Sequence, residues 1–146
     1  MAEIPPVCDF GWQAKEFKDG NSKICYIVSS PIATKPDGLN RGEHALMLTN
    51  FQEDGTNHEG SIDTGFTFKP ISMVEVTIGS NQYKFFTLET RAWLADDENA
   101  KQMVKDMKNG ARVKVKSTSS RGTNVTDTYS LIGFTKALAA IDKACS

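Results

Sequence analysis

Alternating apolar and polar residues recur along this chain and predict a succession of β-strands. Apolar residues at every second position, many of them β-branched or aromatic, are typical of strands that bury one face. The clearest case is Met73–Ile78, where Val74, Val76 and Ile78 share a face. The other predicted strands are residues 12–17, 23–28, 45–50, 59–66, 83–88, 91–94, 112–116 and 123–131. We therefore expect eight or nine strands.

The segments between these strands differ in length. Asp19-Gly20-Asn21 is a short turn sequence, so the first two strands are expected to form a hairpin. Residues 30–42 instead make a long polar stretch rich in Pro, Gly and Asn. Loops of this length often carry function, which makes this stretch a candidate functional loop.

Two segments follow the helical period instead. Asp96 or Asp97 is a suitable N-cap for the first helix, which is expected to end at Gly110. The second helix follows a break at Gly133 and runs to Cys145. Apolar residues three and four positions apart form one stripe on each helix. The stripes are Ala100, Met103, Val104 and Met107, then Phe134, Ala137, Leu138, Ile141 and Cys145.

The chain has the length of one domain and shows no internal linker. Residues 1–11 contain Pro5, Pro6 and Gly11 and are interpreted as an irregular arm, and residues 12–146 as a single domain. Many short strands with turns and two helices predict a mainly antiparallel β fold, most simply a β-sandwich with the C-terminal helix packed on the sheet.

The charge balance limits the classes of partner. There are 17 Lys and Arg against 18 Asp and Glu, a net charge of −1, so no nucleic-acid partner is expected. Arg112, Lys114 and Lys116 share a strand face, which we interpret as solvated. No apolar run approaches the roughly 20 residues of a membrane helix, and residues 1–6 do not resemble a secretion signal. A cytosolic protein and a mature exported chain both remain open.

The three cysteines, Cys8, Cys25 and Cys145, match no zinc-binding or redox spacing. Cys25 lies inside a predicted strand and Cys145 on the apolar stripe of the last helix, so the favoured hypothesis is a Cys25–Cys145 disulfide in an oxidising compartment. Three buried thiols in a cytosolic protein are the alternative. With the disulfide formed, Cys8 is free or intermolecular, and we expect a monomer or weak dimer.

Residues able to carry catalysis are few. His44 and His58 are the only histidines, neither lies in a nucleophile motif, and both are interpreted as surface residues. The methionines are interpreted as core residues, and no metal or cofactor is expected. Asp127 shares strand parity with apolar residues and is expected to point inward, with Arg121 or nearby threonines as partners. We therefore expect a protein that is not an enzyme.

Two regions are candidates for contact with a partner. The first is the polar loop from residue 35 to residue 41, with the charged and polar side chains of Lys35, Asp37, Asn40 and Arg41. The second is Trp93 with Phe85 or Phe86, close to Arg91. Aromatic residues in strands lie more often in the core, which is the alternative for the second region.

Several sequence segments resemble the invasion-associated locus B family of exported bacterial proteins. The most specific is the last, Arg121-Gly-Thr through Thr126-Asp-Thr-Tyr-Ser-Leu to Ala140-Ile-Asp-Lys-Ala-Cys. The others are Lys23-Ile-Cys-Tyr, Ser29-x-Pro31, Asn40-Arg-Gly, Leu46-Met-Leu-Thr, Phe85-Phe-Thr, Ala92-Trp-Leu and Met107-Lys-x-Gly110. Together they extend from about residue 10 to the end of the chain.

This resemblance implies an immunoglobulin-like β-sandwich located in the periplasm or secreted, its export signal already removed. It also implies an interaction or accessory factor that acts on an unknown protein or envelope partner and supports entry into host cells. Many family members carry a cysteine just after the first-strand Trp, whereas here Cys8 precedes Trp12. This departure favours the Cys25–Cys145 pair. A periplasmic module with a small-ligand pocket between the sheets or under the last helix is the alternative function.

Overall fold

A computed structural model describes residues 11–94 and 97–146, which form ten strands and two helices. The predicted arm up to residue 10, Cys8 and the Asp96 cap lie outside these residues. The strands are β1 (Gln13–Asp19), β2 (Ser22–Ser29), β3 (Ala33–Lys35), β4 (Ala45–Phe51), β5 (Thr56–Asp63), β6 (Met73–Ile78), β7 (Asn81–Leu88), β8 (Arg91–Trp93), β9 (Arg112–Thr118) and β10 (Asn124–Ser130). The helices are α1 (Asp97–Asn109) and α2 (Phe134–Ala144).

All strand pairs are antiparallel, and they join into one sheet with the order β1-β2-β4-β5-β8-β7-β6-β9-β10-β3. The expected hairpin of β1 and β2 is present, with Gly20 of the turn at a φ of 68°. The short strand β3 was not predicted. It lies in the expected loop and adds an edge beside β10.

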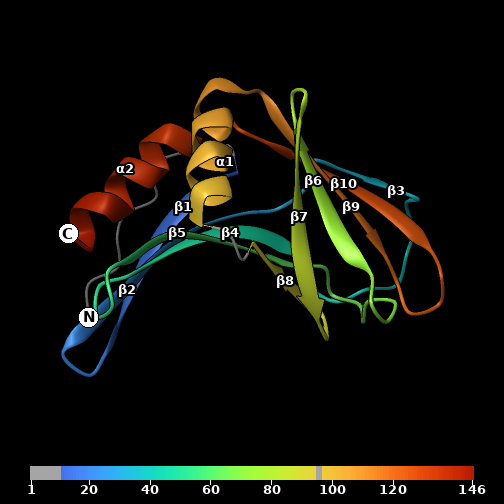
Figure 1. The fold of residues 1–146 in the computed structure, drawn as a ribbon, viewed down its shortest axis with the longest axis horizontal. Coiled ribbons are helices and arrows are strands. Elements are labelled where there is room, and N and C mark those ends of the chain that lie inside the picture. The colour runs from blue at the N-terminus through green and yellow to red at the C-terminus, as the bar shows by residue number, and fades with distance from the viewer. Residues whose placement is uncertain (1–10, 95–96) are drawn as a thin grey trace.

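The sheet bends strongly, so that strands far apart in the sheet order meet. Trp12, directly before β1, donates its indole N–H to the backbone oxygen of Ser130 at the end of β10, at 2.7 Å. Figure 1 shows the two halves of the sheet meeting at a steep angle. Alternate residues of both halves point into one continuous hydrophobic core, which includes Leu48, Val76, Phe85 and Tyr129. The predicted mainly β class with two helices is confirmed.

Both helices lie on the concave side of the sheet, where α2 packs over β1, β2 and β4 and α1 packs over β5, β6 and β7 (Figure 1). The predicted stripe of α2 is buried, with Phe134, Ala137, Leu138 and Ile141 each at most 1% exposed. The predicted disulfide joins Cys25 of β2 to Cys145 directly after α2, with the two Cα atoms 6.1 Å apart. The C-terminal helix is thus fixed covalently to the N-terminal hairpin. Neither helix of the described residues lies on the convex face of the sheet.

Candidate functional site

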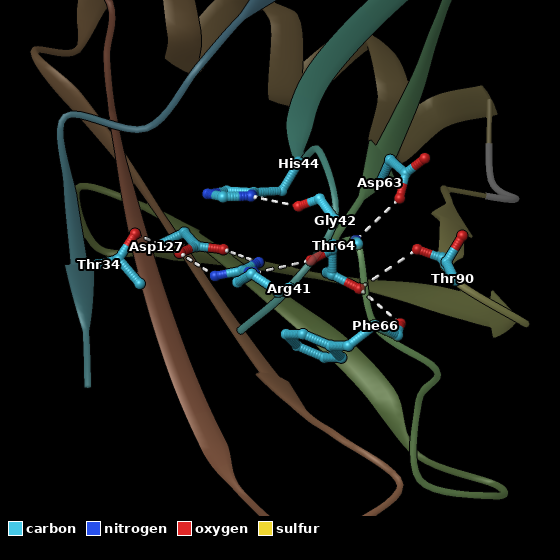
Figure 2. A network of polar contacts seen from close by, with 10 residues as sticks. Thr34, Arg41, Gly42, His44, Asp63, Thr64, Phe66, Thr90 and Asp127 are labelled. Atoms are coloured by element: carbon cyan, nitrogen blue, oxygen red, sulfur yellow. Dashed lines mark hydrogen bonds and ion pairs between the residues drawn. The ribbon is translucent and has the colours of Figure 1, made fainter. Parts of the chain in front are cut away.

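A buried ion pair lies where the loop of residues 36–44 crosses β10. Arg41 donates from Nη1 and Nη2 to the two carboxylate oxygens of Asp127, at 3.0 and 2.9 Å, and the Thr34 hydroxyl donates to the same carboxylate. The side chains of Arg41 and Asp127 are 4% and 1% exposed. Figure 2 shows the guanidinium lying between Asp127 on one side and Thr64 on the other. Asp127 points inward because it shares its strand face with Val125 and Tyr129.

The same arginine fixes the loop to the segment that follows β5. Its Nε donates to the backbone oxygen of Thr64 at 2.9 Å, and its guanidinium carbon lies 4.9 Å from the ring centroid of Phe66. One residue further on, the amide of Gly42 donates to the backbone oxygen of Gly65. Gly65 has a φ of 72°, and a Cβ there would lie 2.3 Å from the Gly42 oxygen, so this close approach requires glycine.

This arrangement corrects two predictions made from the sequence. Arg41 is not an exposed contact residue, because its guanidinium is buried against Asp127. The partner of Asp127 is Arg41 and not Arg121, together with a threonine from β3. Arg41 and Asp127 are 86 positions apart in sequence, so no local pattern could pair them.

The remaining predicted residues of the loop, Lys35, Asp37 and Asn40, are exposed, and Asn40 lines a pocket of about 310 Å³. The opposite wall is the tip of the β9–β10 hairpin, and Phe66 stands between the two walls. The complete lining is Leu39, Asn40, Arg41, Phe66, Ser119, Ser120, Arg121, Thr123 and Val125. The pocket therefore lies neither between two sheet layers nor under α2, where the alternative function placed it.

The pocket brings together two of the sequence segments singled out above. Asn40 and Arg41 of the Asn40-Arg41-Gly42 segment line one wall, and Arg121 and Thr123 of the Arg121-Gly122-Thr123 segment line the other. Among the described residues, Arg121 is exposed and forms no ion pair. An arginine without a counter-charge beside hydroxyl and amide groups is suited to binding an anion.

The second predicted region, around Trp93, lies on the convex face of the sheet. Phe86 and Trp93 are neighbours in register across β7 and β8, with ring centroids 5.6 Å apart, and Met73 is the partner of Phe86 on β6. We call Met73, Phe86, Leu88 and Trp93 the aromatic patch. Phe86 is 44% and Leu88 62% exposed, whereas Phe85 points into the core. Met73 is 48% exposed, so its interpretation as a core residue was wrong.

A chain of polar contacts runs from Arg91, beside this patch, to Gly65, the residue that holds the loop forming one wall of the pocket. Arg91 of β8 is the register partner of Leu88 of β7, and its Nε lies 3.6 Å from a carboxylate oxygen of Asp63. The other Asp63 oxygen accepts a hydrogen bond from the amide of Gly65, the glycine against which the loop is fixed. The two predicted contact regions are therefore held at the same end of β5.

The two histidines occupy different surroundings. The His44 Nδ1 lies 3.0 Å from the backbone oxygen of Gly42. His58 lies with its Nε2 2.8 Å from Asp142 of α2, and the buried Asn50 contacts both residues through its side chain. The described residues include no group of three or more side chains suited to holding a metal ion.

Two buried hydroxyl groups, those of Ser117 and Tyr129, lack a hydrogen-bond partner among the described residues and were not predicted from the sequence. Tyr129 is fully buried. Burial, together with the nearby Asp127 charge, raises the pKa of this phenol. Its inward direction follows from strand parity, but its missing partner depends on contacts that the sequence does not contain.

The fold and site define a mainly β protein with one disulfide, a loop fixed by a buried ion pair, and an adjoining surface pocket. The family described as "Invasion associated locus B (IalB) protein" matches residues 12–142. The chain belongs to this family, as its sequence segments indicated. Comparison with curated proteins and with solved structures found no match. None of the described helices has the length and apolar character needed to cross a membrane.

Proposed function

We propose that this protein is an exported, non-enzymatic component of the bacterial envelope, periplasmic or secreted, that acts as an interaction or accessory factor and supports association with host cells. The observation that carries the proposal is the buried Cys25–Cys145 disulfide in a member of the invasion-associated locus B family. Structural disulfides form and persist in oxidising compartments such as the periplasm or the cell surface.

The surface of the protein supports a role in binding. The aromatic patch presents Phe86, Leu88 and Trp93 on the convex face of the sheet, which neither described helix covers. Aromatic residues that remain partly exposed are common in the central contacts of protein interfaces. Arg91, 53% exposed on its side chain, adds a charge at the edge of this patch.

The surroundings of the histidines support a role without catalysis. His44 contacts a backbone oxygen and His58 a carboxylate, and neither has a hydroxyl or thiol partner among the described residues. A histidine acting as a general base needs the group it deprotonates within hydrogen-bond reach.

The exposed loop residues Lys35, Asp37 and Asn40 are also part of the proposed contact surface.

Location is tested in the bacterium that encodes the protein. Cells are treated with a thiol-blocking reagent before lysis, the periplasm is released by osmotic shock, and the mass of the protein is measured. We expect the protein in the periplasmic or culture fraction with Cys25 and Cys145 unmodified. A cytosolic protein with both thiols blocked would refute the exported location.

Host association is tested with a deletion strain complemented by variant genes. We expect Phe86→Ser with Trp93→Ser to lower host-cell association several-fold at unchanged protein abundance. Ile132→Ser is the matched control, because Ile132 is 62% exposed but lies outside the patch. Equal association by deleted and complemented strains would contradict the proposed role.

A second candidate function is a small-ligand-binding module, which the pocket beside the loop favours. Its volume of about 310 Å³ lies at the lower end of the range of roughly 300–1,000 Å³ for small-molecule sites. Native mass spectrometry of protein recovered from the envelope fraction tests this candidate. A bound small molecule that is lost on unfolding is the expected result, and a bare protein mass is the contrary one.

A further inference from the structure

The pocket between the loop and the β9–β10 hairpin has walls that are fixed on both sides. The tip of the hairpin is tied to the segment after β5, because the amide of Ser120 donates to Thr67 and the amide of Lys69 donates to Thr118. The loop is tied by the Arg41–Asp127 pair described above. A pocket with walls held in this way is formed before a ligand arrives, which lowers the cost of binding.

The charges of the pocket favour an anion. The lining contains two arginines and no carboxylate. Arg41 is neutralised by Asp127 and has its guanidinium committed to three hydrogen bonds. Arg121 is exposed and unpaired among the described residues, so one positive charge remains for a ligand.

Some neutral polar groups of the lining already form hydrogen bonds within the protein, and others do not. The Ser119 hydroxyl accepts the amide of Thr123 within the turn, and the amide of Gly122 donates to the Ser119 backbone oxygen. In contrast, the side chains of Asn40 and Ser120 have no hydrogen-bond partner in the described part of the chain. Both stand in the lining with Arg121 and add hydrogen-bonding capacity on the two walls.

The rest of the lining is apolar. Leu39, Phe66 and Val125 come from the loop, the segment after β5 and β10, and Val125 is only 1% exposed. Phe66 is held in place by the guanidinium of Arg41 and by an edge contact with Phe68 at 5.9 Å. A ligand filling this space gains from burying an apolar body as well as from pairing its charge.

We propose that this pocket binds a small organic monoanion, whose carboxylate pairs with Arg121 and whose apolar body lies against Leu39, Phe66 and Val125. The inference rests on the second candidate function and gives its ligand a chemical class. One uncompensated charge matches one carboxylate, whereas a phosphate monoester brings close to two negative charges. The guanidinium fork of an arginine donates hydrogen bonds to both oxygens of a carboxylate.

The experiment titrates the purified, oxidised protein with phenylacetate and follows the backbone amides by NMR. Phenylacetamide removes the charge at nearly constant shape, and acetate removes the apolar body. We expect phenylacetate to shift the amides of residues 119–123 and of Asn40 and to bind at least tenfold more tightly than either control. N-acetylphenylalanine and 4-methylpentanoate extend the titration to other apolar bodies.

Two arginine variants locate the binding charge. We expect Arg121→Gln to weaken phenylacetate binding about tenfold or more, and Arg121→Lys to weaken it less. Arg112→Gln is the matched control, because Arg112 is also an exposed arginine of this hairpin but lies outside the pocket lining. Unchanged binding in Arg121→Gln, with its spectrum otherwise folded, would overturn the proposal.

Three further outcomes would also overturn it. These are equal binding of phenylacetamide, equal binding of acetate, and no saturable binding by any of the three carboxylates with apolar bodies. The second candidate function fails independently of these results. A molecule other than a carboxylate found on protein recovered from cells would leave the ligand-binding function in place while excluding the carboxylate. A bare native mass together with saturable phenylacetate binding would contradict the ligand-binding function while leaving the carboxylate specificity of the pocket in place.

Discussion

The buried pair of Arg41 and Asp127 gives the most direct test of how this fold holds its loop. Replacing Arg41 by Met keeps much of the apolar stem but removes the charge. Asp127, 1% exposed, then retains only the hydroxyl of Thr34 as a side-chain partner. An uncompensated buried charge of this kind costs about 3–5 kcal/mol, which is a large part of the roughly 5–15 kcal/mol that stabilises a typical domain.

The magnitude follows from the geometry of the contacts. Two parallel hydrogen bonds of 2.9–3.0 Å join the guanidinium to the carboxylate, and a third, from Nε to Thr64, is lost with them. We therefore expect Arg41→Met to lower the free energy of unfolding by about 3–5 kcal/mol. At this chain length that corresponds to a fall in Tm on the order of 10 °C.

The assay is urea unfolding of the oxidised protein, followed by tryptophan fluorescence. The double variant Arg41→Met with Asp127→Leu removes both charges and is expected to recover most of the loss, because paired apolar replacements of buried ion pairs are often nearly neutral. Arg91→Ala is the control, since its pair with Asp63 is 3.6 Å long and largely exposed and is expected to contribute under about 1 kcal/mol. Equal losses in Arg41→Met and Arg91→Ala would refute the reasoning.

Three other predictions concern the backbone, the disulfide and a titrating carboxyl. Gly65→Ala is expected to lower the free energy of unfolding at least twice as much as Gly55→Ala in thermal unfolding, because both glycines have φ near 72° but only at Gly65 would the Cβ meet a backbone oxygen, at 2.3 Å. Gly55→Ala is expected to cost about 1–2 kcal/mol. Equal costs would contradict the steric argument. Reduction of the Cys25–Cys145 bond, which closes a separation of 120 residues, is expected to lower the stability by about 4–5 kcal/mol in denaturant titrations, and a loss below about 1 kcal/mol would show that it contributes little. Burial tends to raise the pKa of Asp106, but hydrogen bonds from three side chains hold it below its ordinary value of 3.8. The contribution of Asp106 to folding stability is therefore present above pH 3.8 and lost as the pH falls through the lower folded pKa. Asp106→Asn is expected to be less stable than the wild type at pH 6 and to approach the stability of the wild type near pH 2. A stability difference that does not change with pH would contradict this.

The strand pattern of the sequence was sufficient for most of the fold. Val74, Val76 and Ile78 point into the core as their spacing predicted, and the stripe of α2 is buried. The short β3 was missed because three residues with exposed ends show no alternation, and their pairing with β10 comes from the course of the chain. Strand parity predicts that Phe85 and Phe86 point to opposite faces of the sheet, but it does not show which of the two is buried.

The candidate site could be predicted only in part, because its contacts join distant segments. Asp127 was expected to point inward and to need partners, and it does. Arg121 or nearby threonines were expected as its partners because they are close in sequence, whereas Arg41 is brought there by the loop after β3. The exposure of Asn40 agrees with its proposed contact role, but the pocket that it shares with the hairpin follows only from the tertiary structure.

The two arginines of the pocket have separate physical roles, and the difference follows from their counter-charges. Arg41 is neutralised and buried, so it fixes the wall and supports Phe66 without offering a charge to a ligand. Arg121 stands on the other wall with no carboxylate among the lining residues, so its charge is available. If Arg41 were the binding group, Asp127 would have to lose its partner on binding, at the cost estimated above. The free-energy cost of binding an anion in this pocket is therefore lowest when the loop stays in place and Arg121 alone supplies the charge.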